Sequence, residues 1–190
     1  MDDARGALTS GSGAREGAAV RTLIMAFWRI CLLRESPQRL PASGFLLALS
    51  LAAYFLVAVL LAAVTLPLST ALAAAGVDTL LLAALLLAAL QLRRVPSRLN
   101  QSLTAAAGSL ALLGAISLPA TQWLNVLMTQ GGDVTLPLAL ILLLQGWSIA
   151  VIAHVLRHAL DLSFLAGLGI ALLYFIVALQ ILNALFVPVT

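Results

Sequence analysis

Lysine is absent from this sequence of 190 residues, and all ten basic residues are arginine. Charge of either sign is scarce, because charged residues make up 9% of the chain and hydrophobic residues 63%. A soluble domain carries about 25% charged and about 45–50% apolar residues. A water-soluble fold of this size could not bury so much apolar surface. The composition therefore predicts a membrane protein, whose outward faces are solvated by lipid.

Cysteine is nearly absent as well, and several enzyme motifs are missing. The one cysteine, Cys31, excludes an intrachain disulfide. The sequence contains no HExxH, GxSxG, Walker A or GxGxxG pattern. The segments between the apolar runs are too short for a separate catalytic domain. We therefore expect a protein that is not an enzyme and that holds no cofactor.

Five long apolar segments dominate the chain. Since a helix needs about 20 apolar residues to cross the hydrocarbon, they predict an all-α polytopic bundle of five transmembrane helices. The expected spans are residues 45–66, 72–92, 103–124, 136–156 and 162–187. Residues 67–69 are predicted to form a short turn, and the run Gln130-Gly131-Gly132-Asp133 is predicted to form another.

The chain divides into three predicted parts. Residues 1–20 are rich in glycine, alanine and serine without an apolar period, which predicts a disordered extension. Met25 is an alternative natural start. Residues 21–40 are predicted to form a separate amphipathic segment, and residues 41–190 the five-helix transmembrane bundle.

The amphipathic segment carries an apolar face formed by Ile24, Phe27, Trp28 and Cys31. Such a helix is typical of segments that lie in the membrane interface, where we expect Trp28 to act as an anchor. A helix packed under the bundle is the alternative. Trp123, near the end of the third span, is predicted to be a second interface anchor.

Arginine is distributed on one side only. The expected far side of the bundle, formed by the loops near 67–71 and 129–135 and the C-terminal end, has no basic residue. The ten basic residues all lie on the other side: Arg5, Arg15, Arg21, Arg29, Arg34, Arg39, Arg93, Arg94, Arg98 and Arg157. The excess of arginine in cytoplasmic loops predicts a cytoplasmic N-terminus and a C-terminus on the other side. The pI near 10 therefore reflects orientation, and we expect no nucleic-acid partner. Together with heavy alanine and leucine usage, the lack of lysine favours a bacterial inner-membrane protein with a periplasmic C-terminus.

Asp78 is an acid inside the second apolar segment, 14 residues before the expected cytoplasmic edge at Leu92. An intramembrane carboxylate is by default a candidate functional residue. The favoured interpretation is different: Gly76 breaks the segment, and Asp78 starts the helix at the far interface, where the dipole stabilises an acid.

Three amides, Gln145, Gln180 and Asn183, fall inside predicted spans. With Asp78 they form the candidate intramembrane polar site. Such amides more often bond a neighbouring helix than a substrate. Gly108, Gly114, Gly167 and Gly169 permit close helix approach and predict a tight bundle or an oligomer.

His154, His158 and Asp161 are a candidate metal site, because on one continuous helix their spacing of four and three residues gives them a common face. The favoured interpretation is that they are ordinary polar residues at the cytoplasmic end of the fourth span. Two histidines are also too few for a clustered histidine box.

The fourth span resembles part of a known family. Gly146-Trp147-Ser148, then 153–157 (AHVLR), Leu162-Ser163 and a fifth span containing glycine look like the last third of the Yip-domain family. The Ser36-Pro37 and Pro41 pattern before the first span is also similar, so the resemblance covers residues 36–187. It implies a five-span, non-catalytic protein that acts through protein or lipid contacts. The family's Asp-Leu-Tyr-Gly-Pro motif is missing, so the resemblance implies no GTPase-binding residues.

Three functions remain open. The first is a non-enzymatic inner-membrane protein that organises or partners other proteins, with the lipid bilayer and a protein partner or a second copy as its contacts. The second is a small transporter, or a transporter subunit, that uses Asp78 and the span amides. The third is a metal-binding membrane enzyme. Convergence of the polar span residues on one cavity would favour the second.

Overall fold

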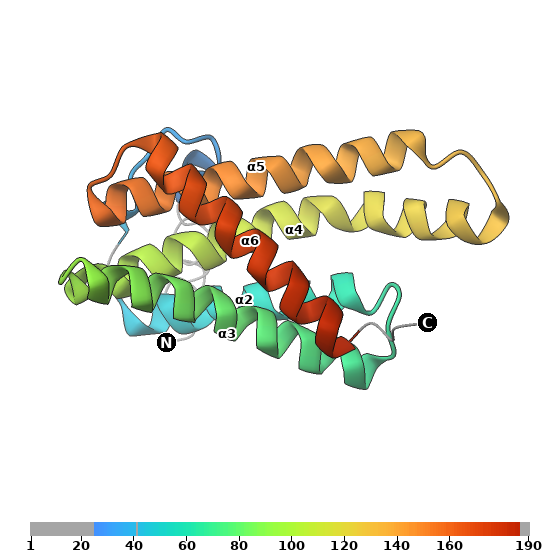
Figure 1. Ribbon diagram of the computed structural model, residues 1–190, viewed down its shortest axis with the longest axis horizontal. Helices are drawn as coiled ribbons and strands as arrows, with labels where there is room; N and C mark the ends of the chain where they lie inside the picture. The colour runs from blue at the N-terminus through green and yellow to red at the C-terminus, as the bar shows by residue number, and fades with distance from the viewer. Residues whose placement is uncertain (1–24, 41, 187–190) are drawn as a thin grey trace, which may run out of the picture.

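The computed structural model describes residues 25–40 and 42–186 of the chain (Figure 1). The predicted disordered extension, residues 1–20, and Ile24 lie outside the described residues. Whether Met1 or Met25 is the natural start therefore stays a prediction. Within them, five helices are long and apolar enough to cross a membrane: α2 (Gly44–Ala62), α3 (Leu68–Leu92), α4 (Leu99–Gln130), α5 (Thr135–Leu160) and α6 (Phe164–Phe186). Two short 3-10 helices, η1 (Pro37–Arg39) and η2 (Pro96–Arg98), precede α2 and α4. The prediction of an all-α, multi-pass membrane bundle is confirmed.

The helices begin and end where the sequence supplies a suitable cap. Ser43 precedes α2 and accepts the backbone N–H of Leu46 on its side chain, at 3.4 Å. Pro67 precedes α3, where the missing N–H of proline costs nothing because a helix start leaves that donor unbonded. The helix therefore begins at Leu68, four residues before the predicted start of the span, and the turn lies before Leu68.

Helix α4 is longer than predicted at both ends. It continues through Pro119 to Gln130, although proline removes one helical hydrogen bond. The helix ends at Gly131, whose φ of 71° is a left-handed conformation that suits glycine. Gly132 then donates its N–H to the carbonyl of Leu127 at 2.9 Å. The predicted turn at 130–133 is confirmed.

Helix α4 is the centre of the bundle. It packs against α2 on one side and α5 on the other, while α6 packs against α5 and also reaches α3 (Figure 1). Every residue from 102 to 109 is buried, and most of them are small: the run reads SLTAAAGS. Small side chains let neighbouring helices approach α4 from all sides.

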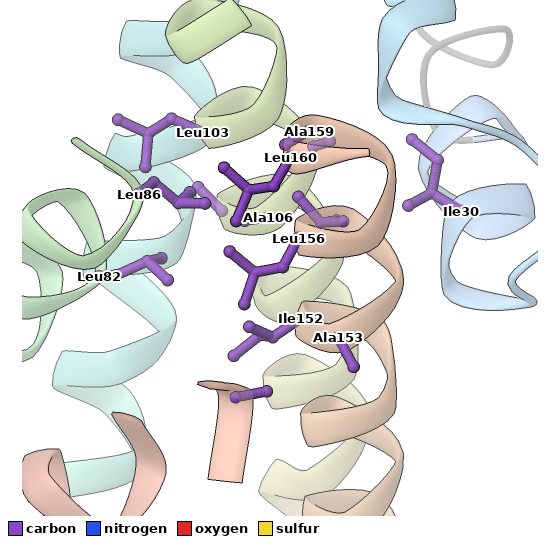
Figure 2. Packing of buried hydrophobic residues seen from close by; sticks show 14 of the residues in the cluster. Ile30, Leu82, Leu86, Leu103, Ala106, Ile152, Ala153, Leu156, Ala159 and Leu160 are labelled. Carbon is purple, nitrogen blue, oxygen red and sulfur yellow. The ribbon is translucent and has the colours of Figure 1, made fainter. Parts of the chain in front are cut away.

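The largest core cluster lies where α3 and α5 end and α4 begins. Leucines of α3, including Leu82 and Leu86, meet Leu103 and Ala106 of α4 and Leu156 of α5 (Figure 2). Several arginines lie at the same end: Arg93 donates to the carbonyl of Leu160 at 2.9 Å, and η2 ends on Arg98. We call this the arginine end of the bundle.

Three of the four glycines predicted to permit close approach do so. A Cβ atom at Gly167 would lie 2.6 Å from the carbonyl oxygen of Ala153 in α5. A Cβ atom at Gly108 would overlap the ring of Phe27, and one at Gly114 would lie 2.7 Å from the side chain of Val57. Gly169 has open space around it, so that part of the prediction is wrong.

Residues 25–40, called the N-terminal segment from here on, pack against the bundle. Residues 25–31 are helical. Ile30 and Cys31 are buried, and Ile30 joins the core cluster from the opposite side of α5 to Leu82 (Figure 2). These contacts correspond to the alternative in which the helix packs against the bundle. The buried face differs from the predicted apolar face, because Ile30 is buried and Trp28 is exposed. The depth of the segment in a bilayer stays a prediction.

Candidate functional site

A cavity of about 290 Å³ lies inside the bundle and is lined by residues of all five long helices. Small-molecule sites are typically clefts of about 300–1,000 Å³, so this one is at the lower limit of that range. Most of its wall is apolar. The polar lining residues are Tyr54 of α2, Asp78 of α3, Ser117 and Thr121 of α4, Gln145 and Ser148 of α5, and Tyr174 of α6.

Asp78 is placed near the middle of α3, and the interpretation that it starts the helix is wrong. The helix begins at Leu68 and runs unbroken through Gly76. At 1.5 Å per residue, Asp78 lies about 15 Å from the first residue and about 21 Å from Leu92. The physical reason is that Pro67 already supplies the helix start, while a single glycine in an apolar helix costs too little to break it.

Tyr54 and Asp78 form the central polar contact of the cavity. The phenol Oη of Tyr54 donates to carboxylate Oδ2 of Asp78 at 2.5 Å. The bond gives each of these two polar groups a partner inside a mostly apolar wall. The bond joins α2 to α3 and holds the carboxylate at the cavity wall.

The serine and threonine hydroxyl groups of the wall donate hydrogen bonds to backbone carbonyls of their own helices. Ser117 donates to the carbonyl of Gly114 at 2.8 Å, and Thr121 donates to that of Ser117 at 3.0 Å. Ser148 donates to the carbonyl of Leu144 at 2.9 Å. Because each hydroxyl has one proton and two lone pairs, these groups keep acceptor capacity but have given away their donor.

The predicted polar site is brought together only in part. Asp78 and Gln145 line the same cavity, from α3 and α5. Gln180 and Asn183 do not line it; both are exposed on α6. The apolar runs predict that these residues lie in spans, but the face each one presents depends on how the helices are arranged around α4.

Sequence reasoning missed both tyrosines. The chain has only two, Tyr54 and Tyr174, and both line the cavity. A signal was present, since each is a hydroxyl-bearing side chain in an otherwise apolar run. Nothing in the one-dimensional pattern, however, places a residue of the first span beside one of the fifth.

The candidate metal residues do not converge on one point. His154 Nε2 lies 3.1 Å from the carbonyl oxygen of Glu35, and the rings of His154 and His158 meet edge-on with centroids 4.5 Å apart. Asp161 accepts from Arg98 at 2.7 Å. Among the residues that the structure describes, no group of three or more His, Cys, Asp or Glu side chains is placed to hold a metal ion. His154 instead helps to fix the N-terminal segment to α5.

The predicted interface anchors are both exposed, Trp28 to 43% and Trp123 to 42%. Exposure fits contact with lipid headgroups, and their depth stays a prediction. The third tryptophan, Trp147, has a different role: its indole Nε1 donates to the carbonyl of Cys31 at 2.8 Å. Cys31 in turn donates its thiol to the carbonyl of Ser109 at 3.5 Å. The N-terminal segment is thus bonded to both α4 and α5.

Comparison with protein-family models, with curated proteins and with solved structures finds no match for this chain. The cavity geometry is therefore the main basis for a functional proposal.

Proposed function

We propose that this chain is a non-enzymatic multi-pass membrane protein that binds a small ligand in the cavity, as a transporter or a transporter subunit. The observation that carries the proposal is the convergence of Asp78 and Gln145, from different helices, on one cavity. Both tyrosines of the chain join them there. Dispersed polar residues, each bonded within its own helix, would have favoured a structural role.

The energetics support a function for Asp78. An acid at the centre of a spanning helix costs about 2.5–3.5 kcal/mol on insertion scales. Tyr54 offsets part of that cost through one hydrogen bond. A leucine at this position would avoid the cost entirely, so a carboxylate beside a cavity is best explained by a ligand, a proton or a coupling ion that meets it.

The orientation that we propose is N-terminus in the cytoplasm and C-terminus in the periplasm of a bacterial inner membrane. The support is the arginine distribution, with Arg93, Arg94, Arg98 and Arg157 all at the arginine end or in its loops. Reporter fusions at Gly132 and Thr190 should both report the non-cytoplasmic side. A cytoplasmic signal at Thr190 would contradict this topology.

Ligand binding is testable with purified protein in detergent. A panel of small amines, amino acids, sugars and alcohols is screened for compounds that raise the melting temperature. A ligand at 100 times its Kd stabilises the folded state by about 2.7 kcal/mol, which is readily measured. The effect should be lost in Asp78→Asn and Gln145→Leu and kept in the matched control Gln180→Leu. Stabilisation that is equal in wild type and in both cavity variants would place binding elsewhere and contradict the proposal.

A second candidate function is the organisation of other membrane proteins, which the resemblance to the Yip-domain family also supports. The specific observation is that Gln180 and Asn183 are exposed on α6, within a helix long and apolar enough to span the membrane. At a spacing of three residues they share a side of the helix. Amides facing lipid are better satisfied by a neighbouring helix, at about 0.6–2 kcal/mol each.

A photo-crosslinking amino acid at Gln180 tests this candidate in native membranes. The control position is Leu185, which is exposed on a different side of α6. A partner band at position 180 that is absent at 185 supports the organiser function. Equal patterns at both positions would indicate random collisions.

A further inference from the structure

The cavity wall carries one acid and no base. Asp78 is the only charged side chain among the described residues that line it, since Gln145, the hydroxyls and the tyrosines are uncharged. Three arginines of the described residues bond to groups outside the cavity: Arg98 to Asp161, Arg93 to the carbonyl of Leu160, and Arg29 to Glu35. A ligand that enters the cavity therefore meets a single acid that no basic side chain of the described wall offsets.

The uncharged polar groups add acceptors more than donors. Ser117, Thr121 and Ser148 all donate to carbonyls of their own helices, which leaves their oxygen lone pairs for a ligand. The hydroxyl of Tyr54 donates its proton to the hydrogen bond with Asp78 and is not available as a donor to a ligand. The remaining donors of the described wall are the amide of Gln145 and the hydroxyl of Tyr174. A ligand with N–H groups or a positive charge would find the larger number of groups, since acceptors come from the three hydroxyls, the Gln145 amide and Asp78.

The rest of the wall limits the kind of cation. It is mostly aliphatic, with Val57, Leu61, Leu113 and Ile152 among its residues. A divalent metal ion such as Ca²⁺ takes about 6–8 oxygen ligands, several of them carboxylates. Asp78 is the one carboxylate among the described residues that line this wall. An organic cation buries its apolar part against such a wall, and the rings of Tyr54 and Tyr174 can add cation–π attraction.

From these three features we infer that the cavity selects small organic monocations of the ammonium type, with Asp78 as the counter-charge. This inference rests on the proposed function and narrows its ligand class. It also assigns separate roles: Asp78 selects the sign of charge, the aliphatic wall holds the body of the ligand, and Tyr54 holds the carboxylate in place.

The test measures charge selectivity with thiol reagents of one size class and three charges. Ser148 is replaced by cysteine in a Cys31→Ser background, and detergent-purified protein is treated with the methanethiosulfonates that carry an aminoethyl, a methyl or a sulfonatoethyl group. Rates are divided by those at Ser69→Cys, because Ser69 is exposed and lies outside the cavity. This division removes the intrinsic reactivity of each reagent.

At Ser148→Cys we expect the normalised ratio of cationic to anionic rate to be at least about tenfold, because a nearby unit charge acts strongly in a site of low dielectric. Asp78→Asn should reduce that ratio towards one, and Asp78→Glu should keep it. The carboxylate control Asp133→Asn, in the exposed turn before α5, should leave it unchanged.

The outcomes distinguish a failure of the cation selectivity from a failure of the proposed ligand-binding function. If the neutral reagent modifies Ser148→Cys but the cationic and anionic reagents react alike, the cation inference is wrong and a ligand-binding cavity stands. A ratio that survives Asp78→Asn would also overturn the inference. If no reagent modifies Ser148→Cys in folded protein while Ser69→Cys reacts, the cavity is closed to ligands, and the proposed function fails with the inference.

Discussion

Trp147 of α5 donates its indole N–H to the main-chain carbonyl of Cys31, which is 116 positions earlier in the chain, at 2.8 Å. Four residues after Cys31, the carbonyl of Glu35 lies 3.1 Å from Nε2 of His154, which is seven residues after Trp147 and on the same face of α5. The N-terminal segment is therefore attached to α5 through its own backbone, at two points about two turns apart on the helix. Removing either hydrogen bond should therefore weaken the packing of the N-terminal segment on α5.

We predict that Trp147→Phe lowers the stability of the folded protein by about 1–3 kcal/mol, because it leaves the Cys31 carbonyl without a donor in a buried setting. The measurement is thermal unfolding in detergent. Trp123→Phe is the matched control, since Trp123 lies in α4 and is exposed to nearly the same extent as Trp147, 42% against 41%. Equal losses for the two variants would show that ring volume, and not the hydrogen bond, determines the effect.

We predict that the Cys31 thiol reacts slowly in folded protein. Burial raises its pKa, and the thiol donates its proton to the carbonyl of Ser109, which also favours the protonated form. N-ethylmaleimide should label it at least about tenfold faster after denaturation in sodium dodecyl sulfate, because only the accessible thiolate reacts. Fast labelling in the folded state would mean that the N-terminal segment leaves the bundle readily.

The same shift gives a pH dependence. A thiol with a raised pKa in the folded state holds its proton longer there than in the unfolded state. Stability from this group is therefore complete below the unfolded pKa, about 8.5, and declines as the pH rises above it. Thermal unfolding between pH 7 and pH 10 should show a decline in wild type that is smaller in Cys31→Ser. Identical slopes would contradict this assignment.

We predict opposite behaviour for two neighbouring glycines of α6. Gly167→Ala places a Cβ atom 2.6 Å from the Ala153 carbonyl oxygen, so α6 must move away from α5. Overpacking of this kind typically costs about 1–3 kcal/mol. Gly169→Ala has space for its methyl group and should be neutral or stabilising. Melting temperatures of the two variants check this, and a similar change in both would show that α6 is not tightly held at Gly167.

Arg98 should contribute more to the stability of the folded protein than its ion pair with Asp161 alone. Its partner carboxylate, on Asp161, is 71% exposed, and exposed pairs contribute only about 0.2–1 kcal/mol. Arg98 also donates to the carbonyl of Ala159 at 3.1 Å, at the C-terminus of α5. We therefore predict that Arg98→Ala destabilises the protein more than Asp161→Asn, by thermal unfolding, while the exposed Arg94→Ala has little effect. A larger effect for Asp161→Asn would contradict this order.

The sequence was sufficient to predict five spanning helices, since long apolar runs report membrane crossing directly. It was less informative about helix ends. Pro67 can close a span or start one, and only the packed chain shows that α3 begins at Leu68. Pro119 can end a helix or be tolerated in it, and here α4 continues for eleven residues to Gln130.

The site was harder to predict than the fold. The sequence identifies Asp78 as an unusual acid within an apolar run. It does not identify the partner, because Tyr54 is 24 residues away on another helix. Gln145 and Gln180 look equivalent in the sequence, as amides within apolar runs. Their different placements, in the cavity and on the outer face of α6, follow from the rotation of each helix about its axis. That rotation is determined by close contacts such as that of Gly167 with Ala153, which depend on the whole bundle.

The buried, small-residue stretch of α4 has a consequence for how the protein is made. The spanning window of α4 has a mean hydropathy of 1.6, whereas those of the other four helices range from 2.1 to 2.6. Partition into the bilayer during synthesis depends on the apolar character of each segment as it leaves the translocon. The central helix of the mature protein is thus the one least suited to enter lipid alone. Its insertion should depend on α2 and α3, which are synthesised before it and can shield its serine and threonine side chains, so a chain that lacks α2 and α3 should leave α4 outside the membrane.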